Sequence, residues 1–148
     1  MNHIKKEIKE KFKNGDILTR LIFINVGIFI AVSIILVCFK LFNLSGDWLT
    51  YLMFPASLHR FIITPWTILT YMFIHSGLIH LLFNMVTLYW FGQLFLNHCT
   101  QKDLMGIYLL GGISGALFYL LCFNIFPVFA NSVFSSYVCG ASAAVMAI

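Results

Sequence analysis

The chain has 148 residues, of which 61% are hydrophobic and only 9% are charged, and its formal net charge is +4. Because soluble domains average about 25% charged residues, this composition excludes a soluble globular protein and indicates that lipid surrounds most of the chain. The sequence also lacks the short alternating segments that a membrane β-barrel needs, so the membrane spans are predicted to be helices.

The beginning of the chain is basic, with six of the nine Lys and Arg residues in its first twenty positions. Since positively charged segments tend to stay on the cytoplasmic side, we expect residues 1–20 to form a cytoplasmic tail and residues 21–148 to form the membrane domain. No nucleic-acid partner is expected, because Glu7, Glu10 and Asp16 interrupt the basic residues and no aromatic ladder accompanies them. The basic residues are Lys5, Lys6, Lys9, Lys11, Lys13 and Arg20.

Three complete membrane spans are predicted, because a bilayer core of about 30 Å takes about 20 apolar residues as a helix. In chain order they are Leu21–Phe39, running outward, Leu78–Leu96, running inward, and Leu104–Phe126, running outward. A short polar turn, Asn97–Asp103, joins the second span to the third. The segment before the second span, residues 43–76, is mostly apolar and aromatic, so we expect it to lie in the membrane interface.

A fourth span is predicted to begin near Cys139 and to run inward. From there to residue 148 a helix rises only about 15 Å, which is half of a bilayer. We therefore expect an all-α polytopic membrane protein of which these residues are the N-terminal part, with three full transmembrane helices plus the start of a fourth, incomplete at the C-terminus.

Polar side chains are predicted to meet near the outer face of the bundle. His80 and Asn84 lie one turn apart on one face of the second span, and Ser142 lies at the start of the fourth span, after Gly140. Polar groups at membrane depth are costly and indicate function. A serine hydroxyl can act as a nucleophile, and donors on one helix face can stabilise an oxyanion.

Helix packing is the alternative explanation for each of these residues taken singly. A serine among small residues, as at Ser142, often serves close helix contact, and a His and Asn pair often joins two helices. The Gly-x-x-x-Gly spacing of Gly111 and Gly115 in the third span indicates packing alone. The four cysteines have no metal-binding spacing, so no metal is expected.

The motifs taken together resemble the rhomboid family of intramembrane serine proteases. Trp66 is followed by His75, His80 and Asn84, which form a His-x4-His-x3-Asn stretch, and a Gly-x-Ser motif follows at residues 140–142. The resemblance covers the chain from about residue 48 onward and implies a rhomboid-like helix bundle.

The resemblance also implies roles for individual residues. Ser142 takes the position of the nucleophile, and His80 and Asn84 take the positions of the oxyanion hole, together with the backbone N–H of Ser142. His75, Gly140 and Trp66 take supporting positions. The family often has Arg where this chain has Thr67, and Leu96 stands where the family has Glu in a Gly-x3-Glu pattern; both departures concern the anchoring of the loop.

The function implied by the resemblance is hydrolysis of peptide bonds in or near transmembrane segments of other membrane proteins, by a Ser-His dyad without metal or cofactor. The expected partners are transmembrane protein substrates and the lipid bilayer, and the expected location is a bacterial inner membrane with the N-terminus in the cytoplasm. Rhomboids take their base from a histidine of the sixth helix, so we expect that histidine beyond residue 148 and expect residues 1–148 alone to be inactive.

Two other functions remain open. A non-catalytic rhomboid-like protein would bind transmembrane clients without cutting them, although binding alone does not require the serine and both oxyanion residues. A small transporter or structural membrane protein would leave the order of the motifs unexplained.

Overall fold

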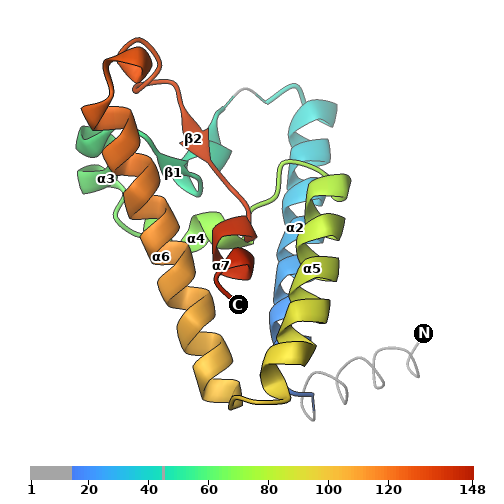
Figure 1. The fold of residues 1–148 in the computed structure, drawn as a ribbon. Coiled ribbons are helices and arrows are strands. Elements are labelled where there is room, and N and C mark those ends of the chain that lie inside the picture. Colours follow the sequence, from blue (N-terminus) through green and yellow to red (C-terminus); the bar gives the residue numbers. More distant parts are fainter. Residues whose placement is uncertain (1–14, 45) are drawn as a thin grey trace.

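The computed structural model describes residues 15–44 and 46–148. Figure 1 shows long helices arranged around a short central one, with the loops gathered at one end. The helices long and apolar enough to cross a membrane are α2 (Ile17–Leu41), α5 (Leu78–Leu96) and α6 (Gln101–Ile125). The all-α polytopic membrane fold is confirmed. Most of the expected basic tail, residues 1–14, lies outside the described residues.

The ends of the spanning helices are explained by local capping. Helix α5 has the predicted bounds and begins after Gly77. Helix α2 begins earlier than predicted because the Asp16 carboxylate accepts a hydrogen bond from the backbone N–H of Thr19 at 2.8 Å. Helix α6 also begins earlier, because Thr100 and Asp103 form a reciprocal capping box. The turn between α5 and α6 is therefore shorter than the sequence suggested.

The remaining elements are short and lie between the spanning helices. Most of them lie at the end of the bundle where α2 and α6 finish and α5 begins, which we call the loop end, whereas α4 and α7 lie further inside the bundle (Figure 1). Before α5 they are η1 (Trp48–Tyr51), β1 (Phe54–Pro55), α3 (Leu58–Ile63), α4 (Thr67–Thr70) and η2 (Tyr71–Phe73); after α6 they are η3 (Pro127–Phe129), β2 (Tyr137–Val138) and α7 (Ser142–Met146).

Two segments outside the predicted membrane spans pair as strands. β1 and β2 form an antiparallel two-stranded sheet in which Phe54 lies opposite Val138 and Pro55 opposite Tyr137. The backbone N–H of Ala56 extends the pairing by donating to the carbonyl of Ser136 at 3.0 Å. The long segment before α5 is therefore joined directly to the chain that leads into α7.

The long segment is also held by side-chain hydrogen bonds of its own. The indole N–H of Trp66 donates to the carbonyl of Tyr51 at 2.8 Å, and the hydroxyl of Thr70 donates to the carbonyl of Leu52 at 2.8 Å. Thr67, which stands where the family often has Arg, is fully buried and its hydroxyl donates to a backbone carbonyl within the same segment. These bonds anchor the segment without the arginine.

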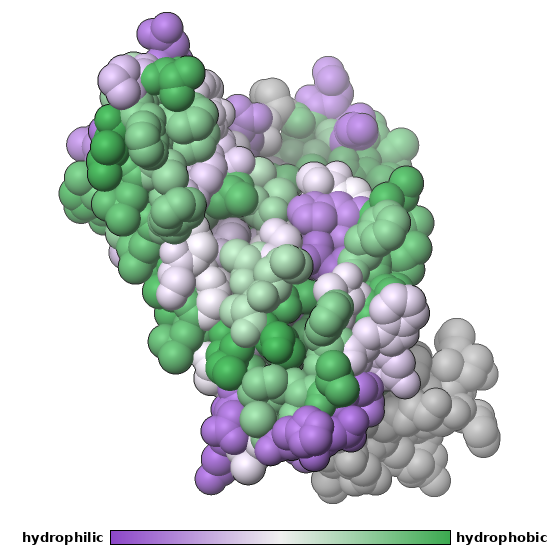
Figure 2. All heavy atoms as spheres, viewed as in Figure 1, coloured by the Kyte–Doolittle hydropathy of each residue, from purple (hydrophilic) through white to green (hydrophobic). Residues whose placement is uncertain are grey.

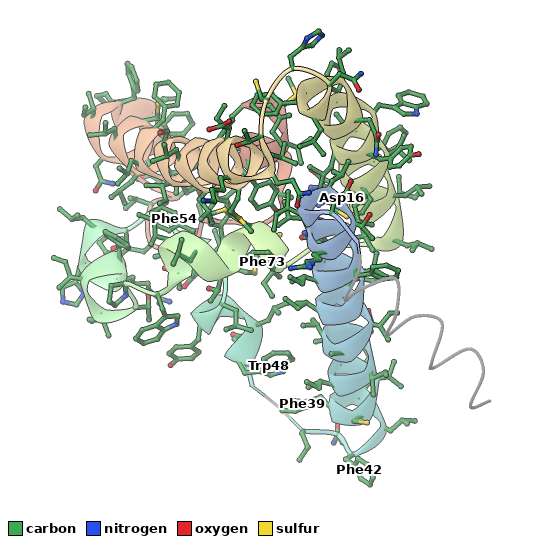
Figure 3. All side chains as sticks on the ribbon, turned by 90° about the horizontal axis from the view of Figure 1, so that it is seen from below. Asp16, Phe39, Phe42, Trp48, Phe54 and Phe73 are labelled. Atoms are coloured by element: carbon green, nitrogen blue, oxygen red, sulfur yellow. The ribbon has the colours of Figure 1, made fainter. Side chains whose placement is uncertain are left out.

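Contacts with the spanning helices hold the long segment at two points, Trp48 and Ala56. At one end the rings of Phe39, near the end of α2, and Trp48 lie 5.9 Å apart, and Figure 3 shows these two side chains together. Near β1 the side-chain amide of Asn124 on α6 donates to the carbonyl of Ala56 at 2.8 Å. The segment thus bridges α2 and α6 across the loop end.

Helix α7 packs closely against α6 through glycines. A Cβ atom placed on Gly115 would lie 2.5 Å from the Cβ of Ala143, and one placed on Gly111 would lie 2.3 Å from the Cβ of Ala147. Real Cβ atoms do not approach so closely, so glycine is needed at both positions. The packing interpretation of this Gly-x-x-x-Gly pair agrees with the structure.

The outer surface of the spanning helices is apolar, as contact with lipid requires. Ile30 on α2, Phe83 on α5 and Phe118 on α6 are 52%, 68% and 70% exposed. Figure 2 shows apolar side chains over most of the visible face and hydrophilic residues at its lower end, where α5 turns into α6. These features support an integral multi-pass membrane protein surrounded by lipid.

The close contact between α6 and α7 can be tested with two glycine substitutions in the same helix. Gly115→Ala is expected to lower the free energy of unfolding by about 1–3 kcal/mol, because its methyl group meets Ala143. Gly106→Ala is the control, since nothing lies within 4 Å of its Cβ position; it is expected to leave stability unchanged or to raise it by up to about 1 kcal/mol. Denaturant titration in detergent micelles measures both, and equal effects would contradict the packing argument.

Candidate active site

The predicted nucleophile lies at the start of the short central helix. Ser142 is the first residue of α7, which sits between α5 and α6 in Figure 1. Its side chain is exposed, and within the described part of the chain its hydroxyl makes no hydrogen bond. The hydroxyl is therefore accessible to a substrate.

Gly140 brings the chain before Ser142 against the imidazole of His80. Its φ angle is +118°, a conformation that residues with a side chain rarely adopt, and a Cβ atom there would lie 2.6 Å from Cε1 and 2.7 Å from Nε2 of His80. Both the backbone conformation and the close approach therefore require glycine. The contact joins the start of α7 to the loop end of α5.

Tyr71 holds Gly140 in this position and joins it to α6. The N–H of Gly140 donates to the carbonyl of Tyr71 at 2.9 Å, and the hydroxyl of Tyr71 donates to the carbonyl of Gly112 on α6 at 2.6 Å. Tyr71 is only 2% exposed, so both bonds lie in the interior. The role of Tyr71 was not predictable from the sequence, because its bonds join positions far apart in the chain and leave no local pattern.

His75 lies beside His80 and is buried. The two ring centroids are 5.2 Å apart with an edge-on arrangement, and His75 is only 5% exposed. Neither of its ring nitrogens makes a hydrogen bond of good geometry within the described residues. Burial, and then the neighbouring imidazole of His80, lowers the pKa of His75, while the backbone of Phe73 opposes the shift more weakly. His75 is therefore neutral near neutral pH and adds no positive charge beside His80.

Asn84 is held on the same side of α5 as His80. Its side-chain N–H donates to the carbonyl of His80 at 2.8 Å, and the residue is 6% exposed. A carboxamide carries two N–H donors, so one remains for a ligand. Figure 2 shows a hydrophilic patch beside the upper part of α5 within the otherwise apolar face, as a polar site between α5 and α7 would produce.

The structure thus brings together most of the residues that the sequence singled out. His75 and Gly140 both contact His80, Asn84 bonds to the backbone of His80, and Ser142 follows Gly140 by two positions. Trp66 is different, because its indole N–H bonds within the long loop segment, where it supports the loop. Ser76, which the sequence analysis passed over, bonds to His80 through its hydroxyl.

The role of Gly140 can be tested by adding a methyl group. Gly140→Ala is expected to displace the His80 ring and to lower the free energy of unfolding by about 1–3 kcal/mol, through backbone strain and the clash with the imidazole. Gly77→Ala is the matched control, because its backbone is extended and nothing lies within 4 Å of its Cβ position. Denaturant titration and the histidine side-chain NMR signals report the two effects. Unchanged His80 signals in Gly140→Ala would show that the contact does not hold the ring.

Comparison with known proteins identifies the family of the chain. A model of the Rhomboid domain matches residues 64–148, a stretch that covers more than half of the chain and contains His75, His80, Asn84 and Ser142. No curated protein and no solved structure gives a significant match. The chain belongs to the rhomboid family.

Proposed function

We propose that the protein is an intramembrane serine protease, which hydrolyses peptide bonds in or near transmembrane segments of other membrane proteins. Rhomboid proteins are generally intramembrane proteases, and the chain belongs to that family. The observation that supports the proposal is the contact between Gly140 and His80, because Gly140 is only two residues before the exposed Ser142 and His80 is bonded to Asn84.

Ser142 is the proposed nucleophile. Its hydroxyl oxygen attacks the carbonyl carbon of the scissile peptide bond and forms a tetrahedral intermediate, whose oxygen carries a negative charge. The side chains of His80 and Asn84 donate hydrogen bonds to this oxyanion. The backbone N–H of Ser142 joins them, because the first N–H groups of a helix have no partner within it.

The general base is proposed to be a histidine outside residues 1–148, as the family resemblance implies. Within the described residues no imidazole hydrogen-bonds to the hydroxyl of Ser142. The base takes the proton of Ser142 during attack and gives it to the leaving amine. A water molecule then hydrolyses the acyl-enzyme: the base takes a proton from the water and returns a proton to Ser142 as the acyl product leaves.

Transmembrane proteins are the proposed substrates, because apolar side chains beside His80 on α5 are exposed. Ile79, Leu82 and Phe83 flank His80 on α5 and are 71%, 57% and 68% exposed. Apolar side chains at this level suit contact with a substrate helix in the bilayer. The proposal includes a cytoplasmic N-terminus and a bacterial inner membrane as the location.

Substitution of the proposed catalytic groups tests the function in the intact protein, reconstituted in liposomes with a fluorogenic transmembrane substrate. Ser142→Ala is expected to abolish cleavage and labelling by a fluorophosphonate, because both need the hydroxyl. His80→Ala and Asn84→Ala are each expected to lower kcat by about 100-fold or more, as loss of an oxyanion donor does. Ser114→Ala, at an exposed position of α6, is the control and is expected to retain activity.

The same assay separates the protease from a non-catalytic binding protein. A wild-type protein that crosslinks to a transmembrane client but neither cleaves it nor reacts with the fluorophosphonate would contradict the proposed protease. Client binding that persists in Ser142→Ala is compatible with both functions, so cleavage is the deciding measurement.

The location of the base is tested by expressing residues 1–148 alone. This form is expected to cleave no substrate, because it lacks the proposed base histidine. The positive control is the intact protein under the same conditions. Robust cleavage by residues 1–148 that is lost on Ser142→Ala would show that the base lies within these residues.

A further inference from the structure

The hydroxyl of Ser76 is bonded to the imidazole of His80. Its Oγ lies 3.1 Å from Nδ1 of His80. A serine just before a helix commonly caps the helix with its hydroxyl, but the N-cap of α5 is Gly77 and no side chain caps this helix. The hydroxyl of Ser76 therefore bonds to His80 and does not cap α5.

The imidazole of His80 is thus held along two edges. Ser76 bonds to Nδ1, while Gly140 lies against the part of the ring that carries Cε1 and Nε2. A hydrogen bond at one nitrogen and a close contact at the other fix the plane of the ring. The edge that faces the chain leading to Ser142 is the one that carries Nε2.

The proposed reaction requires a particular arrangement of protons on this ring. A neutral imidazole has one N–H, so Nε2 can donate to an oxyanion only when Nδ1 is unprotonated, and a hydrogen bond donated to Nδ1 favours that tautomer. The hydroxyl of Ser76 can supply that bond, because it is a donor at the right distance. The neighbouring His75 is buried and neutral, so it adds no charge that would favour a proton on Nδ1 of His80 instead of Nε2.

Ser76 also lies near the segment that leads into α7. Burial raises the pKa of the thiol of Cys139, the residue before Gly140, and the backbone of Ser76 opposes this shift more weakly. Ser76 is therefore close both to His80, to which its side chain bonds, and to the chain that precedes Gly140.

We propose that Ser76 is a positioning residue, whose hydroxyl holds His80 by Nδ1 and so directs a protonated Nε2 toward the oxyanion formed at Ser142. This inference rests on the proposed protease function. Its geometric part, the hydrogen bond that sets the proton on Nε2, stands independently of activity and can be measured by itself.

The test uses the intact protein in liposomes, with Ser76→Ala, Ser76→Thr and the control Ser135→Ala. Ser76→Ala is expected to lower kcat by about 10- to 100-fold with little change in KM, since a misplaced donor weakens the transition state more than substrate binding. Ser76→Thr retains the hydroxyl and is expected to restore most of the activity. Ser135 bonds to a loop carbonyl at the loop end, so Ser135→Ala is expected to behave as wild type.

Nitrogen-15 NMR of the histidine side chains supplies the readout that does not depend on cleavage. In the wild type, Nε2 of His80 is expected to be protonated and Nδ1 to accept a hydrogen bond; in Ser76→Ala the signals are expected to move toward a mixture of the two tautomers. The signals are assigned by their loss in His80→Gln.

The outcomes distinguish this inference from the proposed function. Cleavage by the wild type with unchanged kcat and unchanged His80 signals in Ser76→Ala would overturn the role of Ser76 and leave the protease function intact. A loss of activity that Ser76→Thr does not restore would also overturn it. If the wild type cleaves nothing, the proposed protease function is wrong. Identical His80 signals in the wild type and in Ser76→Ala would then show that Ser76 does not position His80 either.

Discussion

The arrangement of the site depends on the contact between the backbone at Gly140 and the imidazole of His80. It requires a left-handed backbone conformation and the absence of a Cβ atom, and it carries the start of α7 to the loop end of α5. Tyr71 completes it by binding the N–H of Gly140 and the carbonyl of Gly112. Three elements from distant parts of the chain are thus fixed around one histidine.

The lipid environment explains why the bundle needs close contacts such as the one between Gly140 and His80. Apolar burial drives little association between helices that lipid already surrounds, so close packing and internal hydrogen bonds have to hold the bundle together. Gly111 and Gly115 bring α7 onto α6 in the same way that Gly140 brings its segment onto α5. Small residues therefore allow the close approach of α7 to α6 and of the chain before α7 to α5.

Features of the sequence that act locally were sufficient to predict much of this fold. The length of apolar stretches identified the spanning helices, and the bounds of α5 agree with the prediction. The glycine pair at Gly111 and Gly115 indicated packing. The β1–β2 pairing and the bonds of Tyr71 were not predictable, because they join residues far apart in sequence. Ser76 was missed although its spacing of four from His80 is a local signal.

The pairing of β1 with β2 has a mechanical consequence. β2 ends at Val138, two residues before Gly140, and its partner strand belongs to the long segment that bridges α2 and α6. Only Cys139 separates the end of β2 from Gly140, so the connection between them has little slack. A displacement of the bridging segment would therefore also displace the turn that carries Gly140 and Ser142.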